Sequence, residues 1–204
     1  MAAQDINRRE ALKASAAGAV AASSTAEPSA AAAPRGKMPV DDYMAYDGIG
    51  LAGLIAKGDI SPREVLEAAI TRLETVEPRV NCIAQRLFDH GRKQIADGLP
   101  RGPLTGVPFL LKDLSVDLAG VPTGAGSRFF QGDVPEADST VVARYKQAGL
   151  VIFGKSTTPE LGLTGTTEST PHGQTRNPWD LTRTVGGSSG GAGAAVASGI
   201  VAMA

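Results

Sequence analysis

After residue 40 the chain contains segments in which apolar residues recur with a helical period and short apolar runs, and each of these two patterns predicts a different element. The helical period is clearest in SPREVLEAAITRLETVEP, whose apolar residues recur three and four positions apart on one face: Val65, Leu66, Ala69, Ile70, Leu73 and Val76. Ser61, Pro62 and Glu64 supply an N-cap, a first-turn proline and the acid of a capping box. The pattern predicts a helix that begins after Ser61 and ends at Pro78.

Two shorter helical patterns and three apolar runs complete the set of expected elements. YMAYDGIGLAGLIAKGD, preceded by Asp41 and Asp42, is typical of one helix closed by Gly58, and ADSTVVARYKQAG is typical of a capped helix that ends at Gly149. VNCIAQRL, GVPFLLKDL and LVIFGKS are typical of strands, and the last two of buried strands. A strand, a helix and an apolar strand in this order favour an α/β fold with a mainly parallel sheet covered by helices.

The first 34 residues differ from the rest in composition. The paired Arg8 and Arg9 precede a mildly apolar stretch rich in alanine and serine, which is similar to a twin-arginine-type export signal. We therefore expect a signal and disordered Ala-rich segment over 1–34, a folded domain over 35–204, and a periplasmic or secreted protein. A disordered tail on a cytoplasmic protein is the alternative. The serines make this stretch too polar for a membrane span.

Composition removes several classes of function. The 204 residues suffice for one sizeable core, and 20 basic residues against 21 acidic ones give no electrostatic case for binding nucleic acid or an anionic membrane. Cys82 is the single cysteine, and His90 and His172 are far apart in the sequence, so we expect no metal site. The chemistry is therefore sought among serine, lysine and the carboxylates.

Lys112 is the first candidate because it follows Phe109, Leu110 and Leu111 in an expected interior strand. Burial disfavours the ammonium form and lowers the pKa of a lysine, which would make a neutral amine available as a base. The alternative is a structural ion pair, for which Asp113 is the nearest carboxylate. Consecutive residues of a strand point to opposite faces, which places Asp113 poorly for that pair.

The segment TVGGSSGGAGAAVASG, residues 184–199, allows three interpretations. It could be a flexible linker, although it leads directly into helix-forming residues. It could be a phosphate cradle, although Ala192 follows Gly191 where a P-loop needs lysine. It could be a catalytic loop in which glycines permit unusual backbone angles and Ser188 or Ser189 presents a hydroxyl.

Five motifs in order decide between these interpretations: GVPFLLKD, GKSTTPELG, TTES, TRNPWD and TVGGSSGGAGAAVASG. Together they resemble the amidase signature family from about residue 40 to the end of the chain. The resemblance implies an α/β fold with a mixed, mainly parallel central sheet, incomplete in this chain, and a Ser–cis-Ser–Lys triad. Lys112 matches the family lysine. Ser188 matches the bridging serine, which follows a cis peptide bond in the family, here Gly187–Ser188.

The resemblance also assigns the rest of the loop and the missing parts of the site. Supporting roles fall to the other residues of the loop: Gly186, Gly187, Ser189, Gly190 and Gly191. The nucleophilic serine and the oxyanion hole are expected beyond Ala204, so that 35–204 would be the N-terminal part of an amidase domain, inactive alone. The implied reaction forms an acyl-enzyme from a small-molecule amide and uses neither metal nor organic cofactor.

Within the family, the motifs look most like those of amidases that act on linear or cyclic aminohexanoate-type amides. The alternatives are the amidotransferase subunit of the same family and a truncated, non-catalytic remnant. Glu168 in TTES is expected on a loop that borders the pocket, and a solvated carboxylate is the competing interpretation.

Overall fold

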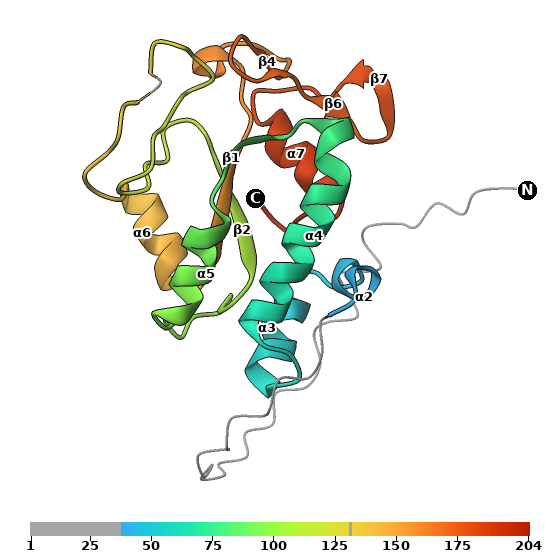
Figure 1. Ribbon diagram of the computed structural model, residues 1–204, viewed down its shortest axis with the longest axis vertical. Helices are drawn as coiled ribbons and strands as arrows, with labels where there is room; N and C mark the ends of the chain where they lie inside the picture. The colour runs from blue at the N-terminus through green and yellow to red at the C-terminus, as the bar shows by residue number, and fades with distance from the viewer. Residues whose placement is uncertain (1–37, 131) are drawn as a thin grey trace, which may run out of the picture. The chain divides into compact units, whose positions relative to one another are not determined.

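The computed structural model describes residues 38–130 and 132–204, so the export signal expected over 1–34 lies outside the described residues. The helices of the described part are α2 (Val40–Met44), α3 (Gly48–Lys57), α4 (Pro62–Val80), α5 (Phe88–Ala96), α6 (Thr140–Gln147) and α7 (Gly190–Ala197), with a 3-10 turn η1 (Glu160–Gly162). The strands are β1 (Ile83–Arg86), β2 (Pro108–Lys112), β3 (Val151–Ser156), β4 (Glu168–Ser169), β5 (Gly173–Gln174), β6 (Arg176–Asn177) and β7 (Asp180–Thr184). Figure 1 shows their arrangement.

A three-stranded sheet in the order β1-β3-β2 forms the centre of this unit. β2 runs parallel to β3, and β1 runs antiparallel to β3, so the sheet is mixed. α6 lies in the crossover between the parallel strands, as the strand–helix–strand pattern predicts. In the parallel register, Leu111 of β2 pairs with Lys155 of β3, and Lys112 pairs with Ser156. The carboxyl ends of both strands therefore reach the same edge of the sheet.

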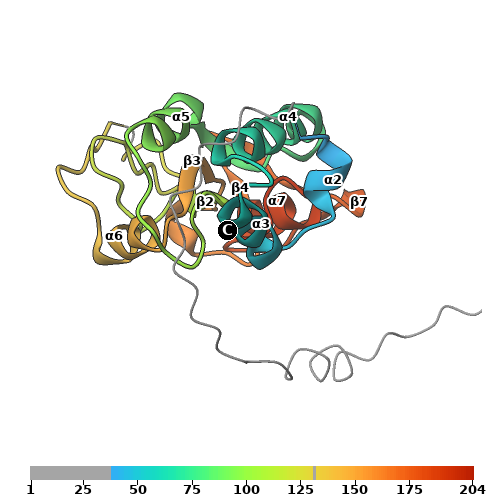
Figure 2. The same ribbon diagram turned by 90° about the horizontal axis from the view of Figure 1, so that it is seen from below.

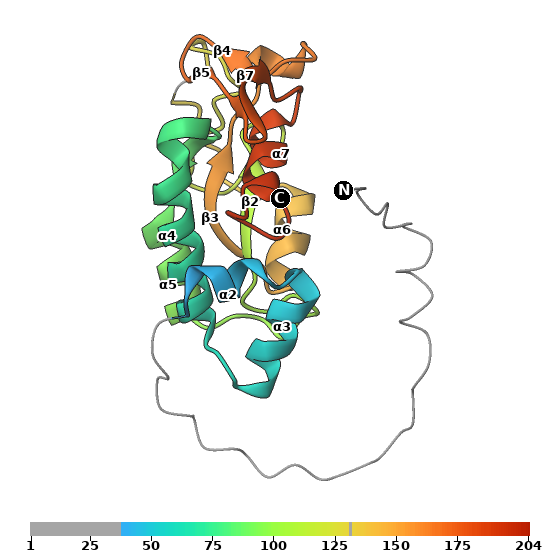
Figure 3. The ribbon, with the colours of Figure 1, turned by 90° about the vertical axis from the view of Figure 1, so that its right-hand side faces the viewer.

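Helices cover both faces of this sheet. α4 and α5 lie on one side of β2 and β3, and α6 and α7 lie on the other, as Figures 2 and 3 show. The core between these layers contains Leu66 and Leu73 of α4 packed with Leu110, Ile152 and Phe153 of the strands, all at most 1% exposed. Each such side chain contributes about 1.5–3 kcal/mol on burial. This apolar core is what fixes the ends of β2 and β3 in space.

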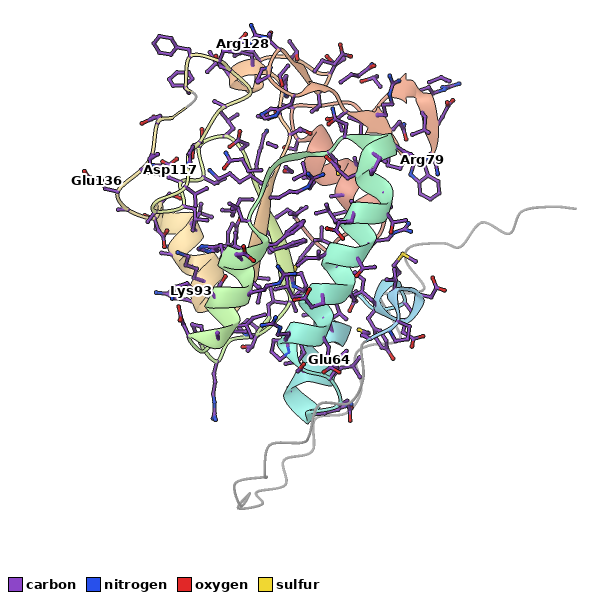
Figure 4. The ribbon with its side chains drawn as sticks, viewed as in Figure 1. Glu64, Arg79, Lys93, Asp117, Arg128 and Glu136 are labelled. Atoms are coloured by element: carbon purple, nitrogen blue, oxygen red, sulfur yellow. The ribbon has the colours of Figure 1, made fainter. Side chains whose placement is uncertain are left out.

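α4 confirms the expected start and corrects the expected end. The Ser61 hydroxyl accepts a hydrogen bond from the Glu64 amide, and the Glu64 carboxylate accepts one from the Ser61 amide, which completes the capping box. The prediction that Pro78 ends the helix is wrong: α4 continues to Val80. Proline removes one N–H donor, and the last turn tolerates this loss because Asn81 caps it in the left-handed region at φ 54°. Figure 4 marks the two ends of α4 by Glu64 and Arg79.

The single helix expected from YMAYDGIGLAGLIAKGD is also corrected, because the structure has two helices there. The chain leaves α2 after Met44, and the Asp47 carboxylate then caps α3 by accepting a hydrogen bond from the Gly50 amide at 2.7 Å. Gly58, at φ 74°, closes α3 as predicted. Among the described residues, no helix combines the length and the apolarity needed to cross a membrane.

Candidate active site

Lys112 and Ser188 meet where β2 ends and α7 begins, two elements that lie side by side (Figure 1). The Lys112 Nζ lies 2.8 Å from the Ser188 Oγ and 3.0 Å from the Ser189 Oγ, and both contacts are hydrogen bonds. The expected approach of residues 112 and 188 is therefore confirmed. Burial of β2 brings the lysine stem to this point, because Phe109, Leu110 and Leu111 anchor the strand in the core.

The loop that carries Ser188 spans Gly186 to Gly190; it follows β7, and its last residue is the first residue of α7. The Gly187–Ser188 peptide bond is cis, as the resemblance implies. Close packing, rather than freedom of the backbone, explains the last two glycines of the motif. A side chain at Gly190 would collide with the Thr167 hydroxyl, and one at Gly191 would collide with the backbone of Thr157. The loop therefore lies directly against two neighbouring segments.

The surroundings of Lys112 favour its neutral form. Burial lowers the pKa of Lys112 from its ordinary value. The positive N-terminal end of α7, which begins two residues after Ser188, acts in the same direction. Within the described residues Lys112 forms no ion pair, since Asp113 turns to the opposite face of the strand and pairs with Lys155. The interpretation of Lys112 as a partner of Asp113 is thus wrong for the physical reason of strand alternation.

Lys155 is a buried lysine that the sequence interpretation missed. Its Nζ donates to the Pro122 carbonyl at 2.6 Å and the Thr123 hydroxyl at 2.9 Å, and it lies 3.7 Å from the Asp113 Oδ1. The Lys155 and Asp113 side chains are 0% and 1% exposed. Burial lowers the pKa of Lys155 and raises the pKa of Asp113, while each charge opposes the shift of the other. The signal in the sequence was a lysine inside the apolar run VIFGKS.

The TTES motif contributes a different residue from the one expected. Glu168 lies exposed in β4, where its carboxylate accepts a hydrogen bond from the side-chain Nε2 of Gln174 at 3.2 Å. Thr167, the residue before it, is buried and bonded to the Ser188 loop on both sides. The motif therefore touches the candidate site through its threonine. Across the described ranges, no three His, Cys, Asp or Glu residues gather in a way that could hold a metal ion.

The amidase family model matches residues 64–204 of the chain. The chain belongs to the amidase signature family. It is 43% identical over 154 residues to 6-aminohexanoate-cyclic-dimer hydrolase of Paenarthrobacter ureafaciens, which covers 74% of this chain and 31% of that protein. It is 39% identical over 169 residues to a glutamyl-tRNA(Gln) amidotransferase subunit of Acidothermus cellulolyticus, which covers 78% of this chain and 33% of that protein.

Solved structures of amidase signature enzymes share the fold. The structure of 6-aminohexanoate cyclic dimer hydrolase complexed with substrate superposes with a TM-score of 0.73 at 40% identity, over 78% of this chain and 33% of that one. The α/β class with a mixed sheet is thereby confirmed as the amidase signature fold. The chain spans about a third of the length of the relatives it matches, 31% and 33% for the two proteins above.

Proposed function

We propose that the chain is the N-terminal part of a longer amidase that hydrolyses a carboxamide C–N bond through a Ser–cis-Ser–Lys triad. The observation that carries this proposal is the 2.8 Å hydrogen bond between the Lys112 Nζ and the Ser188 Oγ in a chain of the amidase signature family. Lys112 acts as the base and Ser188 as the bridge. The nucleophilic serine lies beyond Ala204 in this proposal.

The two hydroxyls around Lys112 suit a neutral amine. In the structure the Lys112 Nζ donates to the Ser188 Oγ and to the Ser189 Oγ. A neutral amine nitrogen has one lone pair and two N–H groups, so in this proposal its lone pair takes the Ser188 proton while one N–H stays on the Ser189 Oγ. An ammonium has three donors and no acceptor, and it would leave Ser188 without a base. Ser189 therefore supports the pair by orienting the amine, and Ser188 is aligned to pass a proton.

The proton moves along this relay in both directions. Lys112 takes the proton of Ser188 as Ser188 takes that of the nucleophile, whose oxygen bonds to the amide carbonyl carbon. When the C–N bond breaks, the same relay delivers the proton to the leaving amine, and an acyl-enzyme remains. Water then attacks the acyl carbon and gives a proton to the relay, the bond between the acyl carbon and the serine oxygen breaks, and the relay returns the proton to the serine as the acid leaves. This scheme draws its base, bridge and nucleophile from side chains and calls for neither a metal nor an organic cofactor.

We further propose a small linear or cyclic amide as the substrate, which the identity to 6-aminohexanoate-cyclic-dimer hydrolase supports. Export through the segment around Arg8 and Arg9 is proposed with it. The second candidate is an amidotransferase subunit, which the identity to the glutamyl-tRNA(Gln) amidotransferase protein favours. Hydrolysis of a 6-aminohexanoate amide by the purified protein alone supports the first candidate, and activity that needs added subunits supports the second.

Lys112→Ala in the full-length protein tests the catalytic roles. Loss of a general base costs typically about 10²–10⁴-fold in rate, so kcat/KM for amide hydrolysis should fall by at least about 100-fold. The circular dichroism spectrum and the melting temperature should stay close to wild type, because Lys112 is half-buried and forms no ion pair in the described part of the chain. Lys93→Ala on α5 is the matched control. Retained turnover in Lys112→Ala would remove the lysine from the mechanism.

A further inference from the structure

Thr166 and Thr167 run alongside the Gly186–Gly190 loop, although they are distant from it in sequence. The Gly187 backbone packs so closely on the Thr166 carbonyl that a Cβ atom at Gly187 would lie 2.8 Å from that oxygen. Thr167 is 1% exposed, and Gly190, on which its hydroxyl lies, is buried. The threonine pair thus forms a wall against which the loop is held.

The Thr167 hydroxyl bonds the loop at both of its ends. It donates to the Gly186 carbonyl at 2.8 Å and accepts from the Gly190 amide at 3.0 Å. Gly186 stands two residues before Ser188, and Gly190 stands two residues after it. One hydroxyl therefore uses its donor and an acceptor lone pair to span the turn that presents Ser188.

We call the Thr167 hydroxyl, with its hydrogen bonds to Gly186 and Gly190, the clamp. The clamp is anchored outside the loop. The Thr167 carbonyl accepts a hydrogen bond from the Thr175 amide at 2.9 Å, which extends the β4–β5 ladder by one pair toward the site. This tie joins two backbone atoms, so it does not depend on the Thr175 side chain. The position of the Thr167 hydroxyl is therefore set by the rest of the fold, and the loop conforms to it.

We propose that Thr167 is a positioning residue that holds the Ser188 Oγ within hydrogen-bond reach of the Lys112 Nζ. This inference rests on the proposed function, because it assigns Thr167 to the alignment of the same pair. Without the hydroxyl, the buried Gly190 amide loses its acceptor and the loop loses its tie at both ends. A displacement of about 1 Å at a reacting group costs on the order of 100-fold in rate.

The test compares four forms of the full-length protein: wild type, Thr167→Val, Thr167→Ser and Thr175→Val. Thr167→Val keeps the shape and removes both hydrogen bonds, so kcat should fall by about 100-fold with little change in KM, since Thr167 acts on Ser188 rather than on substrate. Thr167→Ser retains the hydroxyl and should restore kcat to near wild type. Thr175→Val removes a hydroxyl that is equally buried and hydrogen-bonded but does not touch the loop, and it should leave kcat near wild type.

Three results would overturn the clamp: wild-type kcat in Thr167→Val, equal impairment of Thr167→Ser, or equal impairment of Thr175→Val. If Thr167→Val fails to fold, Thr167→Ala removes the same hydroxyl and should show the same loss of kcat. Failure of both variants to fold, beside a folded Thr175→Val, would make Thr167 a determinant of the fold and also overturn the proposal. Lys112→Ala separates the two hypotheses: an inactive Lys112→Ala beside an active Thr167→Val refutes the clamp alone.

Discussion

Lys112 and Lys155 stand near the carboxyl ends of two neighbouring parallel strands, after apolar residues of similar character, and their side chains meet opposite surroundings. Lys155 is fully buried and lies against Asp113, a carbonyl and a hydroxyl. Lys112 is half-buried and contacts two serine hydroxyls. Burial lowers the pKa of both lysines, but carboxylates oppose that shift at Lys155, Asp113 foremost among them.

The group that contacts a buried lysine, rather than the position of the lysine in its strand, decides what the lysine can do. A carboxylate beside a buried lysine stabilises the charged form of the lysine, which then serves as a structural cation. A lysine surrounded by hydroxyls, beside the positive end of a helix, has no such partner and is ready to act as a base. The same fold therefore holds one lysine beside a buried carboxylate and a second lysine, the proposed base, beside two serine hydroxyls.

Lys155→Met tests whether Lys155 stabilises the fold through its pair with Asp113, and it should have the largest effect on stability. It leaves Asp113 buried without its counter-charge, and removing one partner of a buried pair costs about 3–5 kcal/mol. Urea unfolding should show this loss in the free energy of unfolding. Adding Asp113→Asn to Lys155→Met should recover part of it, since the uncompensated charge is then removed. A single variant as stable as wild type would contradict the structural role of Lys155.

Lys93→Met tests how much an exposed ion pair contributes to stability, for comparison with the buried pair of Lys155 and Asp113. Lys93 on α5, labelled in Figure 4, pairs with Asp97 at 2.7 Å, with side chains 73% and 60% exposed. Exposed pairs contribute about 0–1 kcal/mol because water screens them, so the unfolding midpoint should move little. A loss as large as that of Lys155→Met would show that burial does not set the difference between these ion pairs.

Local patterns predicted the frame of the fold. The capping residues at Ser61 and Glu64 start α4 as expected, and the apolar runs around Phe109 and Ile152 became β2 and β3. These features depend on neighbours in sequence, which is why they can be recognised there. The persistence of α4 through Pro78 depends on a cap at Asn81 that a proline rule does not include.

The residues of the candidate site likewise fall into those that a sequence pattern predicts and those that it does not. Lys112 and Ser188 were predicted from the order of motifs, and the structure brings their side chains together. Lys155 and Thr167 were missed because the partners that give them their roles lie far away in sequence. The apolar run around Lys155 indicates that this lysine is buried, but it does not identify Asp113 as its partner. The role of a buried polar group depends on its tertiary contacts, and the sequence alone does not distinguish Thr167 from a solvent-exposed threonine.

The most direct measurement is the titration of the Lys112 amine by nitrogen NMR in full-length protein labelled at lysine, with Lys112→Arg identifying its resonance. Because the amine is the proposed base, kcat/KM should rise as pH rises through the same pKa. We expect a pKa for Lys112 below the ordinary lysine value of about 10.4. A Lys112 that titrates at or above that value would contradict a neutral amine beside Ser188.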